Sequence, residues 1–283
     1  MQKKTNQVKT LMDAMPFIKE FNKQIIVIKY GGSAQTSPEL KEKFAKDIAL
    51  LSLVGIKPVI VHGGGARINE LLTQLQIKSE FIQGHRVTSK DTMQVVEMVL
   101  CGEINNNITS LLNHHGAKAI GISGKDSSCI KAKPKDEGKW GYTGEITTIN
   151  HKVIEKLISE NFIPVIAPIA DSKHPNHPGY NINADIAACK VAIALKAKKV
   201  LFLTDIVGVL DENKELIHSL TQAKVKELIN NGTISGGMIP KVHACIDAIT
   251  NGVEKAHIID GRVEHSILLE LFTSDGIGTE FIV

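Results

Sequence analysis

The chain has 283 residues, of which 43% are apolar and 22% charged, and its formal net charge is +3. This composition is typical of a folded globular protein and excludes extensive disorder. Because 33 basic residues are interspersed with 30 acidic ones, no basic stripe indicates nucleic-acid binding. The sequence shows neither a signal peptide nor an apolar run near the roughly 20 residues of a membrane span. We therefore expect a cytoplasmic protein with neither nucleic-acid nor membrane partners.

The N-terminal segment has the spacing of an amphipathic helix. Its apolar residues recur at i, i+3, i+4 and i+7, namely at Val8, Leu11, Met12, Met15 and Ile18. The segment precedes the first expected strand as an appendage. Its apolar face can pack on its own domain or on a neighbouring subunit, and the residues leave both alternatives open.

Beyond this segment, β-branched runs and amphipathic runs alternate. Strands are expected over 25–29, 58–61, 117–122, 162–167, 199–203 and 255–259, and helices over 38–54, 66–76, 92–114, 151–160, 184–196, 221–230 and 238–251. Ser37 and Asn183 are suited to cap two of these helices. Such alternation predicts an α/β fold with an open, mostly parallel sheet between two layers of helices.

One segment interrupts the alternation. Residues 130–133 and 145–149 are β-rich and flank a polar stretch, which is typical of a β-hairpin. We expect its tip to act as a lid over a site. A boundary between two lobes is expected near residue 196, between a helix and the next strand.

Glycines follow two of the expected strands. Lys29 ends the first strand and precedes Gly31 and Gly32, and the second strand runs into 62–65, which reads His-Gly-Gly-Gly. In open α/β sheets, ligands bind beyond the carboxyl ends of the strands, where glycines let backbone N–H groups approach an oxyanion. A lysine at a strand end is usually a solvated surface residue. The recurrence of the arrangement nevertheless favours a phosphate site.

The common nucleotide-binding fingerprints are missing. Lys125 is followed by Asp126, where a Walker loop requires Ser or Thr, and no strand leads into a dinucleotide-binding glycine pattern. Phosphoryl transfer needs mainly cations and N–H donors around the transferred group. Lys29 and Lys241, each beside glycines, can supply the cations. The sequence therefore favours phosphoryl transfer over nicotinamide-dependent oxidoreduction.

Other polar residues suit a small substrate. Asn181 and Asn183 are amides able to bind a polar molecule, and Asp185 is an acid that can pair with a lysine. In a purely structural role, Asn183 would cap a helix and Asp185 would be an acid in its first turn. Arg86 follows a glycine and a histidine and can offer a carboxylate its planar fork. The four cysteines are widely spaced, and neither they nor the carboxylates predict a metal site.

Six segments, in this order, resemble the amino acid kinase family: Lys29-Tyr30-Gly31-Gly32, His62-Gly63-Gly64-Gly65, Gly84-His85-Arg86-Val87-Thr88, Asn181-Ile182-Asn183-Ala184-Asp185, Leu203-Thr204-Asp205-Ile206-Val207-Gly208-Val209 and Gly236-Gly237-Met238-Ile239-Pro240-Lys241. Each segment is a weak signal, but six in order are specific and cover nearly the whole chain. The resemblance implies the amino acid kinase fold. It also implies ATP-dependent phosphorylation of the γ-carboxylate of N-acetyl-L-glutamate in arginine biosynthesis, with Mg²⁺ held mainly by the phosphates.

The resemblance also assigns roles to single residues. It implies that Lys29 and Lys241 stabilise the transferring phosphoryl group and that Asp185 orients both lysines. The acceptor substrate would be held by Gly64, Gly65, Arg86, Asn181 and Asn183. Phosphate and nucleotide would be held by Gly31, Gly32, Thr204, Asp205, Gly208, Val209, Ser235 and Gly236. Pro240, beside Lys241, stands where a small aliphatic residue is expected.

The same resemblance implies that the chain is divided into three parts. These are an oligomerisation helix over 1–22, a lobe over 23–196 that binds the amino-acid substrate, and a lobe over 197–283 that binds ATP. The N-terminal helix and the segment 257–279 resemble the arginine-inhibited branch of the family, whose helices interlace dimers into a hexamer, a trimer of dimers. An arginine site would then involve His257, Glu270 and Gly276. The sequence leaves open whether a regulatory protein binds the hexamer.

Several alternatives stand beside this interpretation. Relatives of the same fold would phosphorylate aspartate, glutamate, carbamate or uridylate. Arg86 together with Asn181 and Asn183 favours an acylated amino acid over these. A different class is a catalytically silent arginine-binding regulator, which we would expect to have lost at least one of the two lysines.

Overall fold

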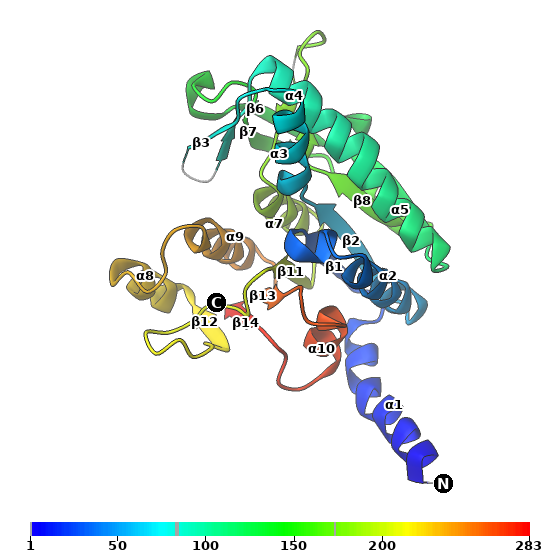
Figure 1. Cartoon of the computed structure of the whole chain (residues 1–283). Helices are drawn as coiled ribbons and strands as arrows, with labels where there is room; N and C mark the ends of the chain where they lie inside the picture. Colours follow the sequence, from blue (N-terminus) through cyan, green and yellow to red (C-terminus); the bar gives the residue numbers. More distant parts are fainter. Residues whose placement is uncertain (1, 83–84, 173) are drawn as a thin grey trace.

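Figure 1 shows the computed structural model, which describes residues 2–82, 85–172 and 174–283. Within these residues, eight strands form one open sheet in the order β12-β14-β13-β11-β1-β2-β8-β5. They are β1 (Ile25–Tyr30), β2 (Lys57–His62), β5 (Ala119–Ser123), β8 (Ile163–Ala167), β11 (Lys199–Thr204), β12 (Ser219–Thr221), β13 (Lys255–Asp260) and β14 (Thr279–Ile282). Neighbouring strands are parallel except β13 and β14, which pair antiparallel. The predicted mostly parallel α/β sheet is confirmed.

Helices cover both faces of the sheet because its strands are apolar on both sides. In β1, Ile26 and Ile28 belong to one core and Val27, which points to the opposite face, belongs to another. The first face carries α2 (Pro38–Leu53), α5 (Asn105–His114) and α10 (Ser266–Phe272), and the second carries α6 (Lys152–Ser159), α7 (Ala184–Ala194), α8 (Gln222–Asn230) and α9 (Met238–Thr250). Ser37 and Asn183 cap α2 and α7, as predicted.

A π-helical turn lies in the middle of the helix expected over 92–114. The helical run begins with α4 (Lys90–Glu97), passes through the π-helical turn η2 (Met98–Ile104) and continues as α5. It starts two residues early because Ser89 Oγ accepts a hydrogen bond from the Thr92 N–H at 3.1 Å. α3 (Gly65–Gln74) begins directly at the second glycine junction. Such π-helical turns are frequent at functional sites, and η2 lines the cavity described below.

Some short elements have no counterpart in the predicted pattern. They are the hairpin of β3 (Glu80–Ile82) and β4 (His85–Val87), the pair β9 (Ile169–Ala170) and β10 (Tyr180–Asn181), the strands β12 and β14, and α10. Strands of two to four residues hold too few positions to display a period of two. Gly84, which belongs to one of the motifs, lies outside the described residues.

The predicted hairpin is confirmed as β6 (Ile130–Pro134) paired antiparallel with β7 (Gly144–Ile149). The chain between them is anchored to the end of β4. Thr88 donates its N–H to the Trp140 carbonyl at 3.1 Å, and Tyr142 donates its N–H to the Thr88 carbonyl at 2.7 Å. These bonds join the hairpin to the segment that carries Arg86. Its action as a lid stays a prediction.

The first helix, α1 (Gln2–Phe21), projects away from the body of the molecule (Figure 1). Its predicted apolar stripe is largely uncovered: Val8, Leu11, Met12 and Met15 are each between 52% and 68% exposed. The last turn differs, because Phe21 is buried in the core beside α2 and α10. The helix is therefore confirmed, and its partner stays a prediction.

The sheet continues across the predicted lobe boundary. β11, the first strand after residue 196, pairs with β1, so strands from both sides of the boundary share one sheet. Strands before the boundary form one half of the sheet and strands after it form the other half. In the part of the chain that the structure describes, no helix is both long and apolar enough to cross a membrane.

Candidate active site

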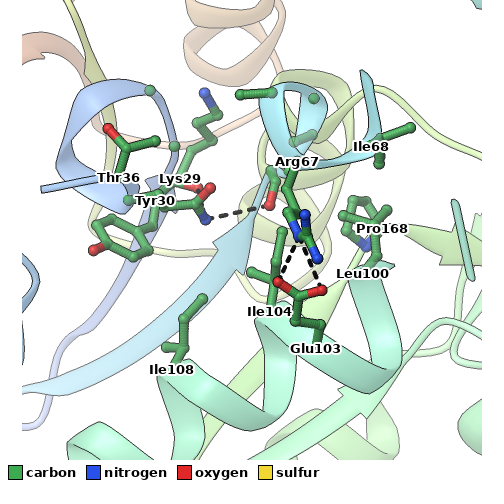
Figure 2. A pocket seen from close by; sticks show the side chains of 18 of the residues that line it. Lys29, Tyr30, Thr36, Arg67, Ile68, Leu100, Glu103, Ile104, Ile108 and Pro168 are labelled. Atoms are coloured by element: carbon green, nitrogen blue, oxygen red, sulfur yellow. Dashed lines mark hydrogen bonds and ion pairs between the residues drawn. The ribbon is translucent and has the colours of Figure 1, made fainter. Parts of the chain in front are cut away.

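A cavity of about 770 Å³ lies at the carboxyl ends of β1 and β2, where ligands bind in open α/β sheets (Figure 2). It brings together ten of the predicted site residues: Lys29, Gly31, Gly32, Gly64, Gly65, Arg86, Asn181, Asn183, Asp185 and Asp205. Its wall is formed by both glycine junctions, the first turns of α3 and α7, and η2. Residues far apart in sequence thus meet around one space.

A buried carboxylate joins the two predicted lysines. Asp185 Oδ1 lies 3.2 Å from Lys29 Nζ, and its Oδ2 accepts a hydrogen bond from Lys241 Nζ at 2.8 Å. Lys29 comes from β1, whereas Asp185 and Lys241 come from the first turns of α7 and α9. Burial alone would raise the pKa of Asp185, but the two lysines lower it to about 2. One carboxylate therefore holds two cations, and one positive charge is left for an anionic ligand.

The glycines add N–H donors beside these cations. In Gly31, Gly32, Gly64 and Gly65 the backbone N–H donates no hydrogen bond to any residue that the structure describes. Gly65 begins α3, so the last two of these groups also lie at the positive end of a helix dipole. The two strand ends are adjacent, because Gly63 N donates to the Tyr30 carbonyl at 2.8 Å. This set of donors suits the oxygens of a phosphate or a carboxylate.

Two of the glycines lie in close contact with neighbouring side chains. Gly32 has φ +69°, and a Cβ there would lie 2.6 Å from Asp205 Oδ1, which accepts a hydrogen bond from Ser33 N at 2.6 Å. A Cβ on Gly64 would lie 2.5 Å from Ile104 Cδ1 on η2. Figure 2 shows Ile104 at the cavity wall. A side chain at Gly32 would be strained by the positive φ, whereas a side chain at Gly64 would require Ile104 to shift.

The other predicted nucleotide residues lie away from the cavity wall. Val209 is buried, and its N–H donates to Thr279 Oγ1 at 2.9 Å. Gly208, at φ +148°, leaves room for the same threonine. Ser235 and Gly236 are exposed just ahead of α9. These residues and the buried Thr204, the last residue of β11, lie in the part of the chain after residue 196.

Arg86 forms part of the cavity wall, and it is buried. Its Nη1 donates to Ser79 Oγ, its Nη2 donates to the Gly65 carbonyl at 3.4 Å, and its Cζ lies 4.6 Å above the Phe81 ring. Burial lowers the pKa of Arg86 but leaves a guanidinium charged at neutral pH. A guanidinium held in this way is oriented before any ligand arrives.

The two predicted amides have structural partners as well as cavity positions. Asn181 Nδ2 donates to Thr88 Oγ1 at 3.1 Å. Asn183 Oδ1 accepts from the N–H groups of Asp185 and Ile186 at 2.9 and 3.2 Å, which makes it the cap of α7. The structural and the functional interpretations of Asn183 are therefore compatible, because capping uses only its oxygen and the residue also lines the cavity.

Sequence reasoning missed some cavity residues. Arg67 follows the glycine triplet closely and donates its Nε to both carboxylate oxygens of Glu103, at 2.8 and 3.0 Å (Figure 2). Thr143, at the end of the hairpin loop, donates to the Arg86 carbonyl. Arg67 could have been found by its position beside the glycines. Glu103 and Thr143 carry no such signal, because a π-helical turn and a loop anchor bring them to the cavity.

The residues of the predicted arginine site also meet, but away from the cavity. His257 Nδ1 lies 2.7 Å from Glu270 Oε1, and Ile277 N donates to Glu270 Oε2 at 2.9 Å. Burial lowers the pKa of His257. Burial also opposes the charge on Glu270, but the contact with His257 holds the pKa of that carboxyl below its usual value. A Cβ on Gly276 would lie 2.8 Å from Glu270 Oε2.

Comparisons with known proteins identify the family of this chain. The model of the amino acid kinase family matches residues 24–260. An acetylglutamate kinase of Aliarcobacter butzleri is 69% identical over 98% of this chain and 92% of its own, and one of Nitratiruptor sp. is 64% identical over 100% and 99%. N-acetylglutamate synthase from Neisseria gonorrhoeae, solved with coenzyme A and N-acetyl-glutamate, matches in fold with a TM-score of 0.88 at 22% identity, over 98% of this chain and 63% of that longer chain. The chain belongs to the amino acid kinase family, and its sequence places it among the acetylglutamate kinases.

Proposed function

We propose that this protein transfers the γ-phosphoryl group of ATP to the γ-carboxylate of N-acetyl-L-glutamate, a step of arginine biosynthesis. The observation that carries the proposal is the Lys29–Asp185–Lys241 cluster beside a cavity lined by glycine N–H groups that have no partner among the described residues. Relatives at 64% and 69% identity that bear the name acetylglutamate kinase support the choice of acceptor.

The proposed reaction needs no general base. A carboxylate is already ionised at neutral pH, so one of its oxygens forms the bond to the γ-phosphorus while the bond to the β–γ bridging oxygen breaks and ADP leaves. Charge on the transferred group is stabilised by cations and preorganised N–H donors. Lys29 and Lys241 supply the cations, and Asp185, ionised at any neutral pH, keeps both in place.

Mg²⁺ would enter this site with the triphosphate. Three carboxylates on the cavity wall are already paired with cations, Asp185 with two lysines and Glu70 and Glu103 with Arg67. The ammonium and N–H donors beside them suit oxygen anions and not a bare cation. Among the described residues no group of three or more His, Cys, Asp or Glu side chains is arranged to hold a metal. The phosphates and water would therefore supply most of the ligands, and the metal would neutralise charge on the β- and γ-oxygens.

The acceptor would lie in the cavity between Arg86 and Lys29. Arg86 would form a bidentate pair with the carboxylate that is not phosphorylated, and Asn181 and Asn183 would bind the acetamido group through their amide N–H groups. The N–H groups of Gly64 and Gly65 would hold the attacking carboxylate near Lys29. ATP would lie along residues 204–209 and 235–236, in the lobe after residue 196.

A hydroxamate-trapping assay tests the proposal. ATP, Mg²⁺ and hydroxylamine are mixed with the protein and one acceptor at a time, from N-acetylglutamate, glutamate, aspartate and carbamate. We expect an acyl phosphate, trapped as its hydroxamate, chiefly from N-acetylglutamate. Turnover of another acceptor in its place would assign the protein to that kinase activity. Arginine binding without turnover of any acceptor would instead indicate a silent regulator.

Regulation and assembly form a second part of the proposal. We propose that arginine inhibits the enzyme at the His257, Glu270 and Gly276 cluster, where a buried carboxylate suits a guanidinium. The exposed apolar stripe of α1 supports its role as the element that joins dimers into a hexamer. A biosynthetic activity of this kind also favours the cytoplasm.

A further inference from the structure

A buried histidine joins the second glycine junction to the π-helical turn. His62, the last residue of β2, is completely buried, and Asn105, the first residue of α5, is nearly so. His62 Nε2 lies 3.1 Å from Asn105 Nδ2, and its Nδ1 lies 3.0 Å from the Gly63 carbonyl. Neither side chain lines the cavity. A buried polar pair behind a binding loop therefore needs an explanation of its own.

These contacts determine the protonation of His62. An amide nitrogen can only donate, so Nε2 accepts from Asn105 and the ring proton must lie on Nδ1. That proton is donated to the Gly63 carbonyl. Burial lowers the pKa of His62 to about 4, and the Gly63 carbonyl opposes this shift. No charged side chain contributes, and the neighbouring Tyr30 stays neutral because burial raises its pKa.

The carbonyl that His62 holds belongs to the peptide bond that carries the Gly64 N–H. A trans peptide is planar, and its C=O and N–H point in opposite directions. A hydrogen bond that orients the Gly63 carbonyl therefore orients the Gly64 N–H. Gln35 Nε2 donates to the same carbonyl at 3.2 Å. The Gly64 N–H, which has no partner among the described residues, lines the cavity as a result.

We propose that His62 and Asn105 are positioning residues for phosphoryl transfer, which aim the Gly64 N–H at the oxygens of the acceptor carboxylate. The inference rests on the proposed function, because it assumes that a carboxylate binds at Gly64. His62 acts through the peptide bond and Asn105 acts through His62. Neither residue touches the substrate.

Asn105 is held in turn by the sheet. Its Nδ2 also donates to the Val165 carbonyl on β8 at 2.9 Å. A Cβ on Gly121 of β5 would lie only 1.9 Å from Asn105 Oδ1, so that only glycine leaves room for the amide. The π-helical turn η2 ends at Ile104 and places Asn105 behind β2. Three strands and one helix thereby determine the direction of a single N–H group.

Substitutions of His62 test this role. His62→Phe keeps a ring of similar size and loses both hydrogen bonds, and His62→Gln retains one donor and one acceptor. We expect His62→Phe to lower kcat/KM for N-acetylglutamate by about tenfold to a hundredfold, as misplaced groups do, with KM for ATP nearly unchanged. His62→Gln should recover part of the loss. His115→Phe, at the far end of α5, is the matched control and should behave as the parent.

Asn105→Asp should change the pH dependence of kcat/KM, which would not be expected if Asn105 only stabilised the fold. The aspartate would draw the proton of neutral His62 to Nε2 and leave Nδ1 without a donor for the Gly63 carbonyl. Only the imidazolium would restore that bond, and the new carboxylate would raise its pKa. We expect the ratio of variant to parent kcat/KM to fall as pH rises through that raised pKa. A ratio independent of pH in a folded variant would overturn the role.

NMR of the ¹⁵N-histidine-labelled parent needs no variant other than His62→Gln for assignment. We expect the His62 signal of a neutral ring protonated at Nδ1 that does not titrate above about pH 5, since its pKa is about 4. An Nε2-protonated or a titrating ring would overturn the inference. A folded His62→Phe enzyme with parental kinetics would do the same and leave the proposed function intact. A parent that phosphorylates no carboxylate would overturn the proposed function, and with it the role assigned to the pair.

Discussion

At the scale of single residues, the site depends on one buried carboxylate between two lysines. Removing a partner from a buried ion cluster is costly, because the remaining charge loses its compensation. Here the loss of one lysine leaves Asp185 paired with the other, at 2.8 or 3.2 Å. Lysine variants should therefore fold, and their defect should appear in the rate of phosphoryl transfer.

The first prediction concerns these lysines. Lys29→Ala or Lys241→Ala should lower kcat by about a hundredfold or more, on the order of 3 kcal/mol, with a smaller rise in KM for the acceptor. The reason is that each ammonium acts on charge that develops during transfer. Steady-state kinetics measure both constants. Lys190→Ala is a matched control, because Lys190 on α7 pairs with Asp247 on α9 at 2.7 Å, outside the site. A near-parental kcat in either site variant would remove that lysine from the mechanism.

The second prediction separates binding from transfer. Arg86→Lys keeps the charge but loses the planar fork, so that KM for N-acetylglutamate should rise, by about tenfold if one bidentate pair is lost. KM for ATP should stay nearly constant, because Arg86 lies among Gly65, Ser79 and Phe81 and not beside the nucleotide segments. Initial rates with each substrate varied in turn measure both constants. A selective rise in KM for ATP would contradict the assignment of Arg86 to the acceptor.

At the scale of elements, α2 and α10 meet through a buried acid. Asp47 Oδ1 lies 2.5 Å from His265 Nδ1, and Lys43 pairs with Glu264 at 3.2 Å beside it. Burial raises the pKa of Asp47 to about 6, although His265 and Lys43 oppose the shift. A carboxyl whose pKa is raised on folding stabilises the folded state fully at pH values below its pKa in the unfolded chain. This contribution is lost as pH rises through the folded-state pKa of about 6.

The third prediction follows from the upward shift of the Asp47 pKa. The rise of the Asp47 pKa from 3.8 to about 6 corresponds to about 3 kcal/mol. The free energy of unfolding of the parent, relative to that of Asp47→Asn, should therefore fall by about this amount between acidic and neutral pH. Urea unfolding over a pH series measures it. Asp13→Asn, on the exposed side of α1, should show no such difference, and parallel pH profiles for parent and Asp47→Asn would refute the prediction.

At the scale of the whole molecule, α1 is the element that reaches beyond the fold. Its exposed apolar residues lie before Pro16, whereas Phe21 is part of the core and contacts Lys199 by a cation–π interaction at 4.9 Å. A truncation that tests assembly should therefore stop before Pro16. Removal of residues 1–22 would also damage the core and confuse the two effects.

The fourth prediction concerns assembly and regulation. Deletion of residues 1–15 should leave phosphoryl transfer largely intact, reduce a hexamer to dimers and weaken arginine inhibition, because an effector must distinguish two arrangements of the assembly. Light scattering and a titration of rate against arginine measure these effects. Leu11→Glu in the full chain should act in the same direction, and Leu53→Glu, on another exposed leucine, should not. A truncated protein that remained hexameric and fully sensitive to arginine would contradict this role and favour the alternative that α1 packs on its own subunit.

Sequence reasoning reached the parts of this molecule that depend on local pattern. The runs around β1 and β2, the caps Ser37 and Asn183, and the hairpin of β6 and β7 all carry their own signals in neighbouring residues. The short hairpin of β3 and β4 and the π-helical turn η2 carry none, because tertiary contacts stabilise them. The same distinction separates Lys29, which was predicted, from Glu103, which was not.

By itself, the sequence determined the alternation of strands and helices, the glycine junctions and the identity of the chemistry-bearing residues, because periodicity, capping and backbone freedom are local properties. Only the tertiary structure decided how closely Asp185 approaches the two lysines, that the Gly63 carbonyl is held by a buried His62, and that Asp47 meets His265. Each of these contacts either joins residues that are distant in the sequence or depends on burial by distant segments. Distances, desolvation and protonation therefore depend on how the helices pack on the sheet.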